Sequence, residues 1–476
     1  MIRIEYVLIV PYLIFLASFI AIADSNESYE NYSILTIIAD VPEGTGTVYL
    51  PGNLPELGPW DPQLYPMKGN GTRRIAALVV PVGSDIEFKF TLGSWDTEAL
   101  DHKGDIPGNH IVSVSGDTTF QVTIPKFRPS WNDEFGLSET EAIPDSGSTL
   151  IVHSPRQHQV FQRRSVSDGM VLISGRSTIP CDVIEYAVFF AESTDTSILA
   201  WRSTDFDSRT YSFSTQEVLP AGGWYTMIIR CRRGKKTVNA VTVSPFGIGE
   251  VFVGAGQSNS TNCGEERLSP KSGMVTTFSG SYWRPAHDPQ PGTHDKSREG
   301  SFWPAFGDAI YRRIGVPIGV AVTGQAGSSI AQWSTDGKLY PWMMHRILQL
   351  GPQGFRALLW HQGEADYDMS SQEYSEKLSE LINRAREDAA WEFPWFVAQA
   401  SYHNPDNDTY DNVREGQNTV IGKGIALNGP DTDTLGEDYR EQNGRGVHFN
   451  GKGLIAHGEL WAQIIGDYLE RLVSGK

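Results

Sequence analysis

The sequence predicts a multidomain protein in which two N-terminal all-β sandwiches precede an α/β/α three-layer domain with a parallel sheet. The chain has 476 residues, 39% of them hydrophobic, which is too long for one ordinary core. Residues 34–246 alternate short apolar and polar stretches broken by Gly, Pro, Asn and Asp, which is typical of β-sandwiches. After Gly247 apolar strands alternate with helical stretches, which indicates a parallel sheet covered on both faces.

The first β unit is expected over residues 34–126. Its stretch 48–62, Val-Tyr-Leu-Pro-Gly-Asn-Leu-Pro-Glu-Leu-Gly-Pro-Trp-Asp-Pro, resembles the opening of starch-binding-like carbohydrate modules. The resemblance implies a sugar ligand, an α-glucan or a similar glycan. Exposed aromatic rings stack on pyranose faces, so Trp60 and Trp95 are the candidate carbohydrate-binding residues. A tryptophan beside a turn is also often a structural plug, and this alternative stays open.

A linker and a second β unit follow. Residues 127–148 are rich in Pro, Ser, Gly and acidic residues, and we expect a linker there. Residues 149–246 are expected to form an immunoglobulin-like β domain. Cys181 and Cys231 both lie in it, whereas Cys263 follows five residues after Ser258. A bridge between Cys181 and Cys231 and a set of three free thiols are both compatible with the sequence.

The N-terminal residues predict the location of the protein, and its net charge restricts the partners that it can bind. An apolar segment at residues 7–23 follows Arg3 and ends in the small-residue pattern Ala21-Ile-Ala23. This predicts a signal peptide over residues 1–23, a secreted or periplasmic location and no membrane attachment after cleavage. The net charge of -18 argues against nucleic acid as a partner, because no basic stripe would neutralise phosphates.

The third unit, residues 247–476, carries the candidate chemistry. Helices are expected near residues 303–314, 371–390 and 453–473, and the long segment 261–301 is expected to form a loop over the cleft. A glycine-lined turn, Gly-Ala-Gly-Gln-Ser-Asn-Ser, follows the first apolar strand and presents Ser258. Acyl-transfer enzymes place a nucleophile on such a turn, because the hydroxyl must project past the backbone into a cleft.

Further polar blocks follow later strands, at the edge where an open α/β sheet places its site. Together with the serine turn, the blocks Ala-Gly-Ser-Ser-Ile-Ala-Gln-Trp at 326–333 and Gln-Gly-Glu at 362–364 resemble the sialate O-acetylesterase and acetylxylan esterase-like branch of the SGNH (GDSL-like) hydrolases. The run Gln-Val-Phe-Gln-Arg at 159–163 extends the resemblance upstream. The Gly-x-Ser-x-Gly elbow of α/β-hydrolases is a poorer match, because Ser260 stands at its last glycine.

The resemblance implies a flavodoxin-like domain and an esterase that removes O-acetyl groups from an acetylated glycan. Ser258 is the expected nucleophile and His448 the base, since an imidazole titrates near neutrality. The oxyanion donors would be the backbone N–H groups of Ser258 and Gly327 and the side-chain amide of Gln362. This chemistry requires no metal and no cofactor.

One departure from the family pattern concerns the acid that orients His448. SGNH hydrolases commonly place an aspartate three residues before the histidine, where this chain has Arg445. We therefore predict that Glu364 orients the ring, with Asp366, Asp433, Asp438 or a backbone carbonyl as alternatives. The missing aspartate also leaves open a carbohydrate-binding protein with an inactive esterase domain. An amidase or a lipase on the same scaffold is a third possibility.

Overall fold

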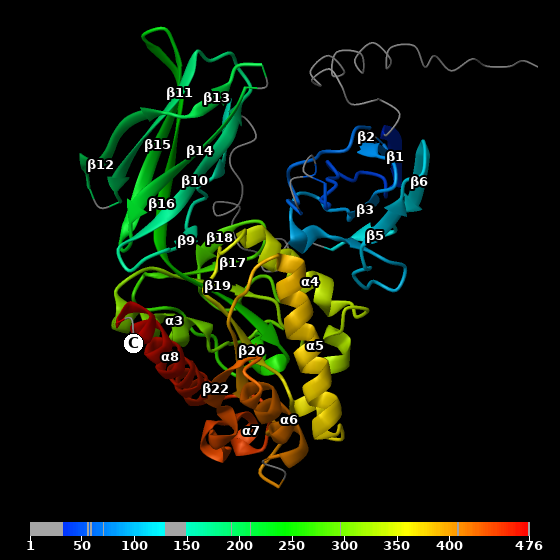
Figure 1. The fold of residues 1–476 in the computed structure, drawn as a ribbon, viewed down its shortest axis with the longest axis vertical. Coiled ribbons are helices and arrows are strands. Elements are labelled where there is room, and N and C mark those ends of the chain that lie inside the picture. Colours follow the sequence, from blue (N-terminus) through cyan, green and yellow to red (C-terminus); the bar gives the residue numbers. More distant parts are fainter. Residues whose placement is uncertain are drawn as a thin grey trace, which may run out of the picture.

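The computed structural model describes residues 32–474 except 55–56, 58–59, 70, 129–148, 192, 210, 296 and 407–408. It is a multidomain chain in which two β-rich units lie above an α/β unit (Figure 1). The predicted signal peptide and most of the predicted linker lie outside the described residues. Of the helices in the described part, none combines the length and apolarity needed to cross a membrane.

The N-terminal unit is built from short strands around one core. Its strands are β1 (Tyr32–Asp40), β2 (Arg73–Pro81), β3 (Asp85–Phe88), β4 (Ala99–Leu100), β5 (His110–Ser113), β6 (Thr118–Thr123) and β7 (Lys126–Phe127). β1 pairs antiparallel with β2 and parallel with β6, while β3 pairs with β5 and β4 with β7. Exposed and buried residues alternate along all of β2, so one face of this strand packs into the core.

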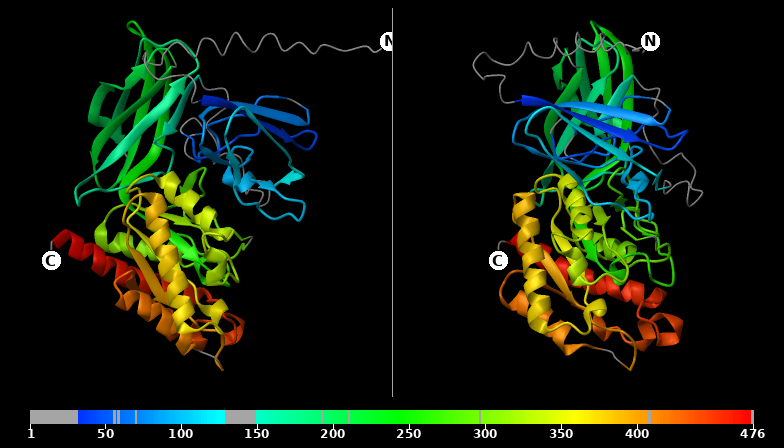
Figure 2. Two further views of the ribbon diagram at one scale, coloured as in Figure 1. Left: turned by 45° about the vertical axis from the view of Figure 1, so that its right-hand side comes forward. Right: turned by 90° about the vertical axis from the view of Figure 1, so that its right-hand side faces the viewer.

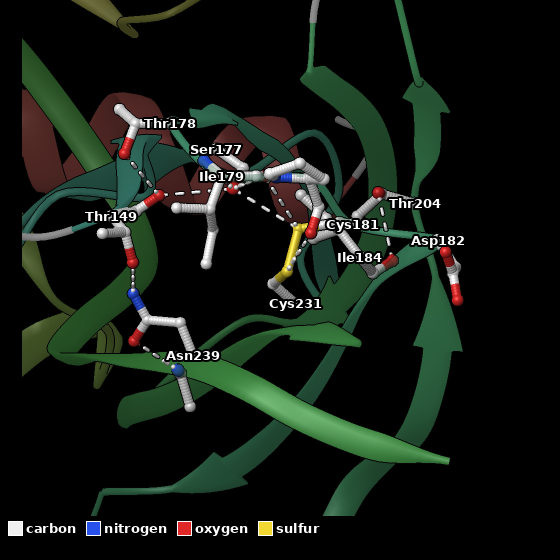
Figure 3. The surroundings of a disulfide bond; sticks show 12 residues. Thr149, Ser177, Thr178, Ile179, Cys181, Asp182, Ile184, Thr204, Cys231 and Asn239 are labelled. Carbon is white, nitrogen blue, oxygen red and sulfur yellow. Dashed lines mark hydrogen bonds between the residues drawn. A yellow bond between two sulfur atoms is a disulfide. The ribbon is translucent and has the colours of Figure 1, made fainter. Parts of the chain in front are cut away.

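The middle unit has two sets of strands, of order β13-β14-β10-β8 and β12-β11-β15-β16. Side chains from both sets form one hydrophobic core. The strands are β8 (Leu150–Ser154), β9 (Val160–Gln162), β10 (Asp168–Ser177), β11 (Val183–Phe190), β12 (Ser193–Ser203), β13 (Asp205–Asp207), β14 (Ser212–Pro220) and β15 (Trp224–Arg233). A disulfide joins Cys181, just before β11, to Cys231 in β15 (Figure 3). The sequence alone left this pairing open.

One strand, β16 (Lys236–Gly256), belongs to both the middle unit and the α/β unit. Its first part pairs antiparallel with β15, and its last part pairs parallel with strands of the α/β sheet. Side chains are partly exposed near Lys236 and fully buried from Phe246 onward. The boundary expected between residues 246 and 247 therefore falls inside a continuous strand, which joins the two units without a linker.

The α/β unit has a sheet of order β18-β17-β19-β16-β20-β21-β22. Its further strands are β17 (Val275–Phe278), β18 (Trp283–Pro285), β19 (Ile318–Val322), β20 (Ala357–His361), β21 (Trp395–Gln399) and β22 (Leu427–Asp431). All neighbours pair parallel except β17 and β18. The sheet order β19-β16-β20-β21-β22 is that of a doubly wound sheet. In such sheets ligands bind outside the carboxyl ends of the strands at the point where the strand order reverses, which here is β16.

Helices cover both faces of this sheet (Figure 2). They are α3 (Trp303–Ile314), α4 (Leu339–Leu350), α5 (Ser371–Ala389), α6 (Asp411–Gly422), the short α7 (Glu441–Gly444) and α8 (Gly451–Ser474). Phe252 of β16 packs into the core with α3 and α8, whereas Val251 and Val253 pack with α4, α5 and α6. This alternation follows from the period of two along a strand. Segment 261–301, expected as a loop, contributes β17 and β18 to the sheet.

Candidate active site

The Ser258 turn is locked to the end of a neighbouring strand. Gly256 has φ +130°, and a Cβ there would lie 2.0 Å from the carbonyl oxygen of His361, so only glycine fits. The backbone N–H of Gln257 donates to that carbonyl at 2.9 Å, and its side-chain Oε1 accepts from the N–H of Gly363 at 3.2 Å. Ser258 itself is 5% exposed. The turn is therefore held rigidly at the carboxyl end of β16.

His448 is paired with a carboxylate that the sequence did not single out. Its Nδ1 lies 2.9 Å from Oε1 of Glu441. The backbone also folds back between them, because the N–H of Glu441 donates to the carbonyl of His448 at 2.9 Å. The His448 side chain is 26% exposed and that of Glu441 17%, so the pair lies at the edge of solvent. Glu441 thus occupies the position of an orienting acid.

The prediction that Glu364 orients His448 is wrong in this structure. Its Oε1 accepts from Asn259 Nδ2 at 2.9 Å and lies 3.0 Å from Nε2 of His361. Burial opposes the charged form of Glu364, but His361 and the hydrogen bond from Asn259 outweigh it and lower the pKa to about 2. Glu364 is a buried residue that stabilises the serine turn through its hydrogen bond with Asn259.

Asn259 connects the serine turn to the histidine loop. Besides binding Glu364, its Nδ2 donates to the carbonyl of Val447 at 3.2 Å. The same carbonyl accepts from Nη1 of Arg440 at 2.6 Å, and the Arg440 guanidinium lies 4.0 Å from the ring centre of Tyr402. The residue after Ser258 and the residue before His448 are therefore joined directly.

The other carboxylates considered for His448 have different partners. Asp433 Oδ2 lies 2.6 Å from Nη1 of Arg414, and Asp366 accepts from the N–H of Ile330 at 2.8 Å. Asp438 is exposed, in the short 3-10 helix Glu437–Tyr439 before α7. Glu441 is thus the acid that this structure pairs with the imidazole.

Two of the three expected oxyanion donors are free in the described part of the chain. The backbone N–H groups of Ser258 and Gly327 have no acceptor among these residues, and Gly327 has φ +66° in an exposed loop. The prediction that Gln362 is an oxyanion donor is wrong in this structure. Its amide nitrogen already donates to Asp366 Oδ2 at 2.5 Å and to the Ser328 carbonyl at 3.2 Å. This fully buried side chain ties loops together and has no free hydrogen for a substrate oxygen.

Trp60 and Trp95 lie at the interface with the α/β unit, contrary to the prediction that they contact sugar. They are 5% and 1% exposed, and their rings stack on His345 of α4 with centroids 4.1 and 5.0 Å away. The backbone N–H of Trp95 donates to Ser281 Oγ at 3.0 Å, and Gln349 Nε2 donates to the backbone carbonyl of Trp60 at 3.1 Å. Neither indole face is open to a sugar ring in this structure.

Residues 248–466 match the model of a family described as carbohydrate esterase, sialic acid-specific acetylesterase. The match spans slightly less than half of the chain and includes every residue of the site described above. No curated protein sequence matches the chain.

Several solved structures are similar over part of the chain. A carbohydrate acetylesterase from Xanthomonas citri is 18% identical over 67% of this chain and 74% of its own, with a TM-score of 0.44. An Arabidopsis thaliana protein is 20% identical over 46% of this chain and 98% of its own, with a TM-score of 0.38. A family 20 carbohydrate-binding module of the maltotetraose-forming amylase from Pseudomonas saccharophila is 18% identical over 19% of this chain and 99% of its own, with a TM-score of 0.14. At such TM-scores these likenesses assign neither fold nor function. The family match to residues 248–466 supports a hydrolytic domain of the carbohydrate-esterase type within a multidomain chain.

Proposed function

We propose that this protein is a serine esterase that removes acetyl groups from a carbohydrate. Ser258 Oγ attacks the acetyl carbonyl while His448 Nε2 takes its proton. His448 then gives this proton to the departing sugar oxygen, which leaves an acetyl group on Ser258. Water, deprotonated by His448, releases acetate and restores the serine. Glu441 holds Nδ1 of the imidazole and stabilises its charged form.

The observation that carries this proposal is the pair of His448 Nδ1 with Glu441 Oε1 at 2.9 Å. It leaves Nε2 for the hydroxyl of Ser258 and fixes the tautomer that a general base needs. Within the described residues no hydrogen bond joins Ser258 to His448. In free enzymes such bonds are often long and tighten when substrate binds. The Glu441 pair also removes the main argument for an inactive domain, which was the absence of an orienting acid.

Charge on the tetrahedral oxygen would be stabilised by the backbone N–H groups of Ser258 and Gly327. Donors of this kind act without reorganisation, because the backbone already holds them. Their lack of acceptors among the described residues supports this role. The loss of one such donor typically costs about 10²- to 10³-fold in rate.

We also propose that the chain is exported, on the basis of the signal-like residues 1–23. The disulfide between Cys181 and Cys231 supports this, since such bridges persist in oxidising compartments. N-terminal sequencing of the protein from the medium or the periplasm tests it, with a new N-terminus near Ala23 as the expected result.

The esterase proposal is tested with Ser258→Ala. We expect the variant to lose roughly 10⁴-fold or more of the turnover of an aryl acetate and to lose labelling by a fluorophosphonate. Acetate release from a set of defined acetylated polysaccharides then identifies the substrate. Equal activity of the variant and the parent would overturn the assignment, and a preference for long acyl chains would favour a lipase.

A further inference from the structure

A cavity with both apolar and polar lining residues lies beside the proposed active site, in the loop that follows β19. Its volume is about 440 Å³, within the usual range of roughly 300 to 1,000 Å³ for small-molecule sites. Most of its wall comes from residues 325–339, and His294 supplies the rest. The polar side chains that line it are His294, Gln325, Gln332, Ser334, Asp336 and Lys338.

The cavity is connected to the catalytic turn through backbone contacts. The N–H of Gln325 donates to the carbonyl of Gly256 at 2.9 Å, two residues before Ser258. Gln325 also lies two residues before Gly327, the proposed oxyanion donor. The cavity wall and the catalytic loops are therefore one continuous structure at the carboxyl edge of the sheet. Gln325 therefore connects the wall of this cavity to the loops that carry Ser258 and Gly327.

His294 is positioned in this cavity before any ligand arrives. Its Nδ1 lies 2.6 Å from Oε1 of Gln325, whose own Nε2 donates to the carbonyl of Ala326 at 3.1 Å. Since the amide orientation is fixed in this way, Nδ1 carries the hydrogen and Nε2 offers a lone pair. The ring also packs edge-on against Trp342 with centroids 5.3 Å apart. Burial lowers the pKa of His294 to about 4, so the ring stays neutral at physiological pH.

The charges around the cavity favour an uncharged ligand. Asp336 is an exposed carboxylate on the wall. Lys338, the one cation among the lining residues, lies 3.8 Å from Asp105 of the N-terminal unit. An acidic sugar would therefore meet as much negative as positive charge, whereas neutral hydroxyl groups can donate to Asp336 and to His294 Nε2.

We propose that this cavity is a subsite for a neutral sugar residue adjacent to the acetylated one, with His294 Nε2 and the Asp336 carboxylate accepting hydrogen bonds from its hydroxyl groups. The assignment of the neighbouring residue as acetylated rests on the proposed esterase function. Binding in the subsite requires no catalysis, so the two ideas fail separately. The contact of Lys338 with Asp105 brings the N-terminal unit to the edge of this cavity.

The test is calorimetric titration of the full-length protein with neutral, unacetylated tetrasaccharides. The set includes xylotetraose, cellotetraose, mannotetraose and maltotetraose, with tetragalacturonate as the acidic comparison. We expect at least one neutral sugar to bind, and His294→Phe to weaken it by about fivefold or more, because Phe keeps the packing on Trp342 and removes the acceptor. Asp336→Ala, at an exposed position that tolerates substitution, should weaken binding at least as much.

The matched control is Asp207→Asn, a partly exposed carboxylate on β13 of the middle unit, which should bind like the parent. Thermal unfolding of each variant shows whether it is folded. Three results would each overturn the subsite: no neutral tetrasaccharide binds, only the acidic one binds, or His294→Phe and Asp336→Ala both bind as tightly as the parent. Binding by a protein that hydrolyses no acetate would retain the subsite and reject the esterase.

Discussion

At the scale of single residues, Glu441 is the acid that pairs with His448, where the family pattern has an aspartate three positions before the histidine. Arg445 fills that position and pairs instead with exposed Asp406 at 3.5 Å. Glu441 lies seven residues before His448 in sequence, but the backbone turn and the longer side chain bring its Oε1 to 2.9 Å from the ring. The change of position therefore still leaves the imidazole of His448 paired with a carboxylate.

Glu441→Gln should slow turnover of an aryl acetate by about 10²- to 10⁴-fold, because an amide neither fixes the tautomer of His448 nor stabilises the imidazolium. The measurement is kcat over a pH series. Asp438→Asn, an exposed carboxylate three residues away in sequence, is the control and should behave like the parent. If Glu364→Gln abolished activity while Glu441→Gln did not, the roles assigned to these two acids would be reversed.

At the scale of elements, the loop over residues 441–448 determines where the acid and the base meet. Gln442 and Asn443 have φ of 53° and 56°, a left-handed turn that reverses the chain right after Glu441. Arg440 and Phe449 form a bridge at the base of this loop. At Gly446 an added Cβ would lie 2.3 Å from Cγ of Glu441, so the absence of a side chain there makes room for the acid.

Gly446→Ala should displace the Glu441 side chain and lower kcat by about 10²-fold, as expected for a small misplacement of a catalytic group. Its effect on thermal stability should be small, because the three atoms nearest the added Cβ all belong to the flexible side chain of Glu441. Gly436→Ala is the matched control, since nothing lies within 4 Å of the added Cβ and its φ of -76° suits alanine. Full activity of Gly446→Ala would show that Glu441 is not held by this contact.

Elements with strong periodicity were predictable and short ones were not. The helix expected over residues 303–314 is confirmed as α3, and those near 371–390 and 453–473 correspond to α5 and α8. Their apolar residues recur on one helical face. β17 has only four residues, Val-Thr-Thr-Phe, and its identity as a strand comes from pairing with β18 and β19. Local sequence carries no signal for such pairing.

At the scale of the whole molecule, the N-terminal unit is docked on the α/β unit through aromatic rings. His345 is sandwiched between Trp60 and Trp95 and is fully buried, and both of its ring nitrogens lack partners among the described residues. Burial, with the nearby positive charges of Lys89 and Arg346, lowers the pKa of His345 well below its ordinary value. The docked state therefore favours the neutral ring.

The free energy of unfolding should consequently decrease as the pH is lowered below about 6.5, because of His345. The ring in the unfolded chain binds a proton below about pH 6.5, whereas the docked ring stays neutral. The contribution of His345 is complete above about pH 6.5 and is lost as pH decreases, by up to about 1.4 kcal/mol per pH unit. Urea unfolding of the parent and of His345→Phe between pH 7.5 and 5.0 measures this, and the variant should show the shallower dependence. Equal slopes would contradict it.

The sequence by itself determined the multidomain organisation and the candidate nucleophile and base, Ser258 and His448. Strand periodicity and the order of blocks at strand ends are local properties, so they can be read without a structure. Only the tertiary structure decided which acid faces His448, because Glu364 and Glu441 differ in their surroundings and not in their chemistry. It also decided that Trp60 and Trp95 face His345, since burial depends on what the rest of the chain packs against them.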